Sequence, residues 1–194
     1  MTNVLAIHSV GESLRSYLDI SFPSDIRAAH PCEFKLLSSG ELSGEVDIDN
    51  ALSLFLYRVT VNEHTRNVRR VNDPARENLP LAVDLHFMLT MWSKSAFTEH
   101  VVMAWAMRQL HQHPVFDAST LTSEASWGPG DFVQVIPAEL TTEEMMRIWD
   151  ALDPGYRLSV SYIARVVRID SDPNPVFAPV VASRFAFDTV LQPQ

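Results

Sequence analysis

With 194 residues, 46% of them hydrophobic and 20% charged, the sequence predicts one globular domain that folds without a disulfide or a metal. Its net charge of −9, from 24 acidic and 15 basic residues, argues against general nucleic-acid binding, which depends on neutralising phosphates. Cys32 is the only cysteine, which excludes an intrachain disulfide and is typical of a cytoplasmic protein. The longest apolar run, 101–107, is far shorter than the ~20 residues that cross a bilayer, and residues 1–8 lack the basic start of a signal peptide.

The first predicted element is an amphipathic helix that ends before Pro23. Steps of three and four residues place one set of apolar side chains on a single helical face: Val4, Ile7, Val10, Leu14 and Leu18. Residues 32–37 then predict a short strand, followed by a turn and an acidic loop.

Residues 52–61 and 81–92 predict two long strands that pair with each other. The first has Leu52, Leu54 and Leu56 on one face. Its other face is predicted to hold Phe55, Tyr57, Val59 and Val61. Because both faces are apolar, we expect a central strand covered on both sides. The second strand alternates strictly from Leu81 to Met91, and the polar stretch 62–78 connects the two.

The second half of the chain predicts two helices and two strands. Residues 97–113 form a wide apolar stripe that Pro114 ends, and residues 132–136 predict a short strand. Thr141 precedes Glu144 by three residues, which is a capping box at the start of a helix that runs to about residue 152. Residues 158–169 predict another long strand. We therefore expect an α+β domain over residues 1–170, with a mixed or antiparallel sheet of about four to five strands packed by two or three helices.

Residues 171–194 predict a C-terminal extended arm. The segment is too apolar for a solvated linker and too rich in proline for a central strand. Its apolar residues are Val176, Phe177, Val180, Val181, Phe185 and Phe187. We expect this arm to pack on a neighbouring subunit or on another component of an assembly. The alternative is that it folds back on its own domain as an edge strand.

The sequence contains no group of residues for which a catalytic role is a better interpretation than a structural one. His30 lies close to the Cys32 thiol, but a small buried residue is the simpler interpretation. Asp84 and His86 share a strand face, and His111 and His113 follow on a helix. The two helix histidines point about 200° apart, so they do not chelate one ion together. We predict no enzymatic activity, no cofactor and no metal.

Arg66, Arg69 and Arg70 form the one basic cluster of an acidic chain. They belong either to a solvated loop or to a surface that forms salt bridges with an acidic partner. The planar guanidinium group of arginine is suited to such salt bridges because it donates two parallel hydrogen bonds to a carboxylate.

An ordered set of segments resembles a known family. The residues 50–59 (Asn-Ala-Leu-Ser-Leu-Phe-Leu-Tyr-Arg-Val) are followed by arginines and then by 79–92 (Leu-Pro-Leu-Ala-Val-Asp-Leu-His-Phe-Met-Leu-Thr-Met-Trp). The helix ending at 111–115, the helix with Trp149 and the segment 156–162 complete the set. Over about residues 4–170 the chain resembles the N-terminal domain of the tail-terminator, or cap, proteins of extracellular contractile injection systems, the phage-tail-like particles of the antifeeding-prophage and virulence-cassette type.

The resemblance implies a structural protein that forms a sixfold ring on the last ring of an inner tube, stops its growth and caps the sheath. The implied partners are further copies of the chain in a homo-hexamer, the inner tube protein and the sheath protein, with a second cap protein left open. Assembly in the cytoplasm, with no nucleic acid and no membrane, is also implied. Two alternatives stay open: an adaptor or baseplate component of the same particle, and a small-molecule-binding enzyme domain that gathers Asp84, His86 and the helix histidines.

Overall fold

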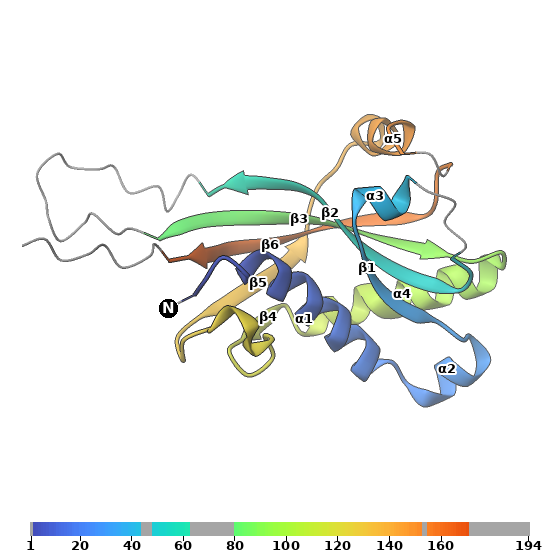
Figure 1. Ribbon diagram of the computed structural model, residues 1–194. Coiled ribbons are helices and arrows are strands. Elements are labelled where there is room, and N and C mark those ends of the chain that lie inside the picture. Colours follow the sequence, from blue (N-terminus) through green and yellow to red (C-terminus); the bar gives the residue numbers. More distant parts are fainter. Residues whose placement is uncertain (1, 44–47, 63–79, 153–154, 171–194) are drawn as a thin grey trace, which may run out of the picture.

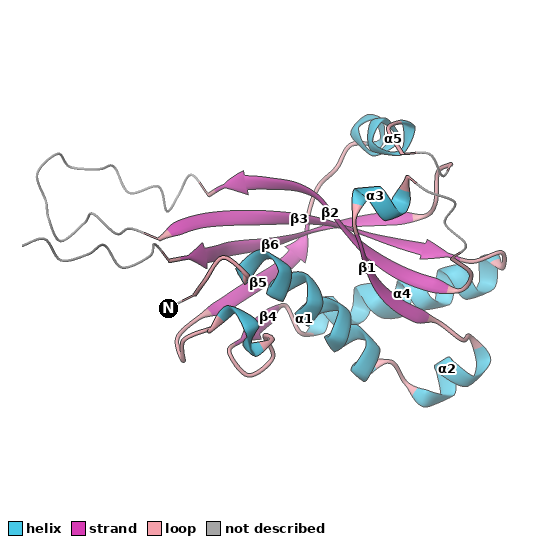
Figure 2. Cartoon of the chain, in the orientation of Figure 1, coloured by secondary structure: helices cyan, strands magenta, loops and turns pink. Residues whose placement is uncertain are grey.

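The computed structural model describes residues 2–43, 48–62, 80–152 and 155–170. Its helices are α1 (Ala6–Ser21), α2 (Ser24–Ala29), α3 (Ser39–Leu42), α4 (Ala96–Gln112), α5 (Thr142–Asp150) and the 3-10 helix η3 (Ser123–Ala125). Its strands are β1 (Glu33–Leu37), β2 (Ala51–Val61), β3 (Leu81–Trp92), β4 (Val115–Asp117), β5 (Phe132–Pro137) and β6 (Ser159–Ile169). Figure 2 shows these elements by type.

The strands form one mixed sheet in the order β1-β2-β3-β6-β5-β4. β1 runs parallel to β2, and all other neighbours are antiparallel. This arrangement confirms the α+β fold and the pairing of the two long strands. The sequence did not predict β4, α2 or α3, because segments of three to six residues are too short to show a periodic pattern.

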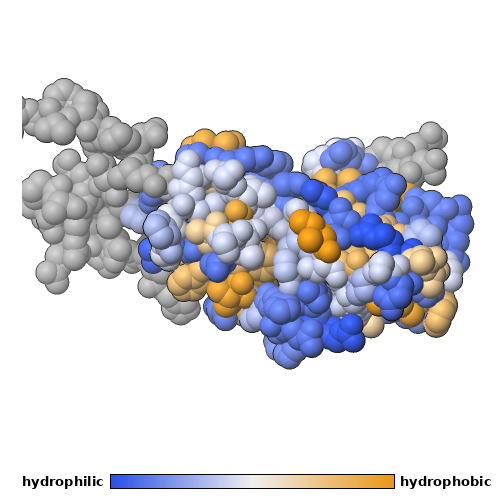
Figure 3. Space-filling model, turned by 90° about the horizontal axis from the view of Figure 1, so that it is seen from below, coloured by the Kyte–Doolittle hydropathy of each residue, from blue (hydrophilic) through white to orange (hydrophobic). Residues whose placement is uncertain are grey.

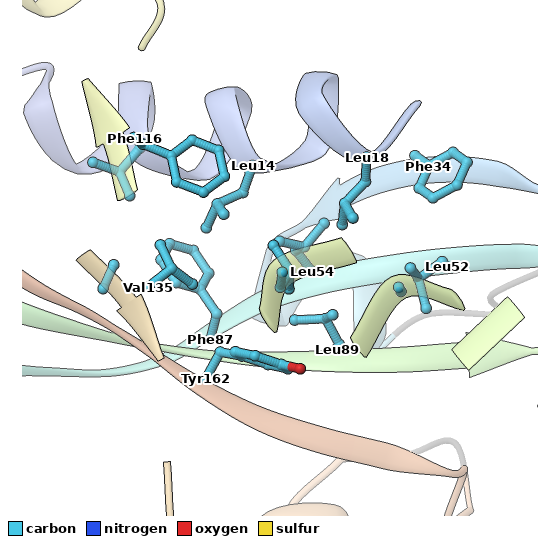
Figure 4. Close-up of a cluster of buried hydrophobic side chains, with 14 of the residues drawn as sticks. Leu14, Leu18, Phe34, Leu52, Leu54, Phe87, Leu89, Phe116, Val135 and Tyr162 are labelled. Atoms are coloured by element: carbon cyan, nitrogen blue, oxygen red, sulfur yellow. The ribbon is translucent and has the colours of Figure 1, made fainter. Parts of the chain in front are cut away.

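Helices cover both faces of the sheet. α1, α2 and α4 lie on one face, and α3 and α5 lie on the other (Figure 1). The larger core lies between α1 and the sheet, where Leu14 and Leu18 of α1 point toward Leu54 of β2 (Figure 4). Gly11 lets α1 approach the sheet closely, because a Cβ there would lie 3.1 Å from the Leu36 methyl groups. Complete burial of such leucines contributes about 1.5–3 kcal/mol each.

The helix boundaries follow the capping signals in the sequence. The Ser95 side chain accepts a hydrogen bond from the Thr98 amide at the start of α4, and Pro114 follows its end. Thr141 and Glu144 form the expected capping box at the start of α5, with each side chain bonded to the other's backbone amide. Within the described residues, no helix is long and apolar enough to cross a membrane.

A smaller core lies beneath α5. Trp149 is buried against Trp92 of β3, with ring centroids 6.2 Å apart, and the Trp92 indole donates a hydrogen bond to Ser53. Ala51 of β2 belongs to this cluster, whereas Leu52 belongs to the larger core. The first half of β2 is therefore covered on both faces, as predicted.

The face that carries α1, α2 and α4 is largely hydrophilic, with separate hydrophobic patches (Figure 3). Several large apolar side chains in and before α1 are exposed to solvent, among them Val4 (79% exposed) and Ile20 (83% exposed). Scattered exposed apolar residues are normal on a protein surface, and only those that adjoin unpaired backbone or clustered charge point to a binding site.

Candidate partner-binding surface

The ends of β2, β3 and β6 extend beyond the helices as a three-stranded ribbon (Figure 1). We call residues 58–62, 80–86 and 163–170 the ribbon end. Val61 pairs with Val83, and Leu81 pairs with Ile169, so the three strands stay in register to their tips. On the face of the larger core Val83, Leu85 and Val167 are buried, so contact with a partner is open to the opposite face and to the exposed side chains at the strand tips.

A bulge in β2 changes which side chains face which side. Leu56 pairs with Phe87, but Arg58 pairs with His86, so Tyr57 is the extra residue. Val59 and Val61 are consequently opposite Leu85 and Val83, on the face of the larger core. The sequence prediction that they share a face with Phe55 and Tyr57 is wrong, because one inserted residue reverses a period of two.

A second bulge in β6 brings two arginines onto one face. Val83 pairs with Val167 and Leu85 with Ala164, so an extra residue lies between these pairs. Arg165 and Arg168 are three positions apart and would point to opposite faces of a regular strand. With the bulge, both line the same hollow, which also contains Val166 and Phe132.

Asp84 stabilises this second bulge. Val166 has a φ of 59°, in the left-handed region that β-branched residues avoid. Its backbone amide donates a 2.8 Å hydrogen bond to Asp84 Oδ1, and the Asn62 side chain donates to both carboxylate oxygens at 3.0 and 2.9 Å. Asp84, a possible metal ligand in the sequence, is thus engaged in shaping the ribbon end.

One face of the ribbon end is rich in arginine. Arg58 and Arg165 line a hollow of about 310 Å³ together with His86. Among the described residues, five other lysine and arginine side chains form ion pairs: Arg15, Arg27, Lys35, Lys94 and Arg147. Arg58, Arg165 and Arg168, by contrast, form no ion pair with any described residue. Partial burial and the neighbouring Arg58 lower the pKa of His86, which favours its neutral form.

The opposite face of the ribbon end is apolar, with Val83, Leu85 and Val167 buried and three outer aliphatic side chains exposed. Val59 is 45% exposed, Val61 54% and Leu81 48%. Arginines on one face and aliphatic side chains on the other give this three-stranded element two chemically different contact surfaces.

The partner-binding residues predicted from the sequence lie outside the described residues. These are the loop residues Arg66, Arg69 and Arg70 and the arm residues Val176, Phe177, Val180, Val181, Phe185 and Phe187. The structure nevertheless locates the points from which both segments leave. Residues 63–79 connect the tips of β2 and β3, and residues 171–194 follow the tip of β6. Both predicted partner-binding segments therefore emerge from the ribbon end.

The other residues considered for chemistry lie apart. Cys32 is buried, and burial raises the pKa of its thiol to about 11, so the reactive thiolate is disfavoured near neutral pH. His111 and His113 lie at the end of α4, which packs on the face of the larger core, whereas His86 pairs with Arg58 on the other face of the sheet. In the part of the chain that the structure describes, no three His, Cys, Asp or Glu residues are grouped for a metal ion.

Comparison with known families identifies the group to which the chain belongs. The sequence profile described as the Pvc16 N-terminal domain matches residues 9–183. The chain is a member of this family. The match confirms the resemblance seen in the sequence, and it extends past β6 into residues 171–183. Among curated proteins, no sequence matches the chain significantly.

Two cryo-EM structures share the fold. One is the PVC sheath/tube terminator of an extracellular contractile injection system in its extended state, with 20% identity and a TM-score of 0.58 over 99% of this chain. The other is the tube-terminating cap of the anti-feeding prophage, with 17% identity and a TM-score of 0.57 over 96% of this chain. The chain spans 66% and 62% of the lengths of these two proteins. At such low identities, the structural similarity shows a common fold and does not by itself show a common function.

Proposed function

We propose that this protein is a structural terminator that caps the inner tube of a contractile injection system. The observation that carries the proposal is the membership in the Pvc16 N-terminal domain family, together with a fold shared over nearly the whole chain with a sheath/tube terminator and a tube-terminating cap. We further propose that it acts as a homo-hexameric ring on the last ring of the tube, in contact with tube and sheath proteins. In this proposal it assembles in the cytoplasm and then becomes part of the particle.

The ribbon end supplies a physical basis for ending growth. A ring stops polymerisation when its lower surface matches a tube subunit and its upper surface does not offer the same match again. The ribbon end has two unlike faces, with Arg165 and Arg168 on one and Val59, Val61 and Leu81 on the other. A component with unlike faces binds a partner on one side without presenting a copy of that partner on the other.

The proposed role requires no catalysis. Asp84 is hydrogen-bonded within a bulge, and the Cys32 thiol is buried with a raised pKa. The composition of the ribbon end is that of a protein interface, which has an apolar centre, a polar rim and an enrichment in arginine. Within this proposal, Arg66, Arg69 and Arg70 contact an acidic surface of the tube or sheath, and the arm packs on a neighbouring subunit.

Negative-stain microscopy and light scattering of the purified protein test the ring. The proposal predicts closed rings of one size, alone or after addition of tube protein. A monomer in both conditions, at the highest concentration reached, would refute it.

A further inference from the structure

One edge of β2 has no strand beside it over its second half. β1 pairs only with Ala51–Phe55, from Glu33↔Ala51 to Leu37↔Phe55. On that side, within the described residues, no strand pairs with residues 56–61. These residues pair with β3 on their other side, so a row of backbone amide and carbonyl groups faces outward, as it does along any sheet edge.

An apolar groove adjoins this free edge. It has a volume of about 480 Å³ and lies between the start of α1 and the sheet, at the point where β1 ends. Apolar side chains that line it include Val4, Leu5, Ile7, Leu36, Leu56 and Phe87. Val59 and Val61 lie farther along β2 on the same face of the sheet and are exposed. An extended segment laid along this edge would therefore meet backbone groups on one side and an apolar surface beneath it.

The two outermost strands of the sheet, β4 and β1, are protected against further pairing. β4 has only three residues, with Pro114 directly before it and the exposed Asp117 at its end. β1 carries an exposed Glu33–Lys35 ion pair on its five residues. Short strands, proline and charge are the features that discourage pairing at an edge. The second half of β2 is longer than β4, and apolar residues adjoin it.

We propose that residues 56–61 of β2 and the adjoining groove receive residues 180–187 of a second copy as an added strand. The inference rests on the proposed function, in which copies assemble into a ring. Residues 180–187, Val-Val-Ala-Ser-Arg-Phe-Ala-Phe, contain no proline, and Val181, Phe185 and Phe187 share one face of an extended segment. These eight residues are long enough to cover the six residues of the free edge, and their apolar face matches the groove.

The connectivity favours a second copy over the same chain. The arm follows β6, and β3 lies between β6 and β2 in the sheet. Residues 63–79 connect β2 and β3 at that same end of the sheet. An arm of the same chain would have to cross that connection, and crossed connections at one end of a sheet are avoided. An arm that arrives from a neighbour does not cross it.

Variants with one added cysteine distinguish an arm donated by a second copy from an arm of the same chain. Val59→Cys in one preparation and Ser183→Cys in a second, differently tagged preparation are mixed and treated with a short bismaleimide. Native Cys32 is buried and has a pKa of about 11, so it reacts slowly. Val61→Cys replaces Val59→Cys if the first variant does not fold. The matched control is Val115→Cys on the opposite edge of the sheet, which is 53% exposed.

We expect a covalent product between the two tagged chains, with the Val59 and Ser183 positions linked in its peptides and no such product for the control. A link found only within one chain, in a Val59→Cys/Ser183→Cys double variant, would overturn the inference. So would equal linking to the control position, or no link in a preparation that forms rings by microscopy. Rings without the link would leave the proposed function intact, whereas absence of rings would refute that function itself.

Discussion

The bulge in β6 depends on Asp84, and replacing this residue with alanine tests that dependence. Asp84→Ala removes the acceptors of three hydrogen bonds, one from the Val166 amide and two from the Asn62 side chain. A hydrogen bond to a charged group contributes about 1.5–3 kcal/mol net, and the three share one partly exposed carboxylate. Relaxation of Val166 out of the left-handed region would return about 1–2 kcal/mol. We therefore expect a net loss of about 2–3 kcal/mol in the free energy of unfolding.

Urea denaturation and thermal unfolding measure this loss. For a chain of this size, 2–3 kcal/mol corresponds to a fall in Tm of about 4–12 °C. Asp84→Asn is the matched control, because it keeps an oxygen that accepts from Val166, and it should lose about half as much or less. The reasoning is refuted if Asp84→Ala unfolds within ~0.5 kcal/mol of the wild type, or if the alanine and asparagine variants are equally unstable.

Four further outcomes follow from the same structure. Leu54→Ala, in the larger core, should reduce the free energy of unfolding by about 2–5 kcal/mol in denaturant titrations, and a loss below ~1 kcal/mol would contradict its packing. Burial raises the pKa of Cys32 to about 11, so stability should fall as pH rises from about 9 toward that value, and Cys32→Ala should remove this part of the pH dependence. Reversing Arg66, Arg69 and Arg70 together to glutamate should weaken association with tube protein and flatten its salt dependence, because single exposed pairs contribute only ~0.2–1 kcal/mol; unchanged binding across a salt series would make the loop a solvated connector. Deletion of residues 174–194 should leave a folded protein that no longer forms rings or caps tubes; unfolding would assign the arm to the core, and normal assembly would refute its role.

Much of the fold could be predicted because its signals are local and repeated. The spacing of Val10, Leu14 and Leu18 in α1 and the alternation along β3 each repeat over many residues. These α1 side chains and the alternating β3 side chains from Val83 to Met91 lie in the larger core. The Thr141–Glu144 capping box could also be predicted, because each side chain accepts a hydrogen bond from the other residue's backbone amide within one helical turn.

The ribbon end could not be predicted in the same way. A bulge adds one residue to a strand without a sequence signal, so Val59 and Val61 were assigned to the wrong face. The positive φ of Val166 could not be predicted either, because β-branched residues rarely adopt the left-handed region. Arg58, Arg165 and Arg168 are far apart in the sequence, and only strand pairing and two bulges bring them to one face. The arginine loop and the arm were recognised from composition, but that both leave from one end of the sheet required the topology.

Capping of the tube is the central claim, and electron microscopy of tubes assembled with and without this protein tests it most directly. Tube protein from the same particle is polymerised at fixed concentration, and the lengths and ends of the tubes are measured. The account predicts shorter tubes when the protein is present, each with one ring of it at a single end. Tubes of unchanged length that carry no such ring would contradict it.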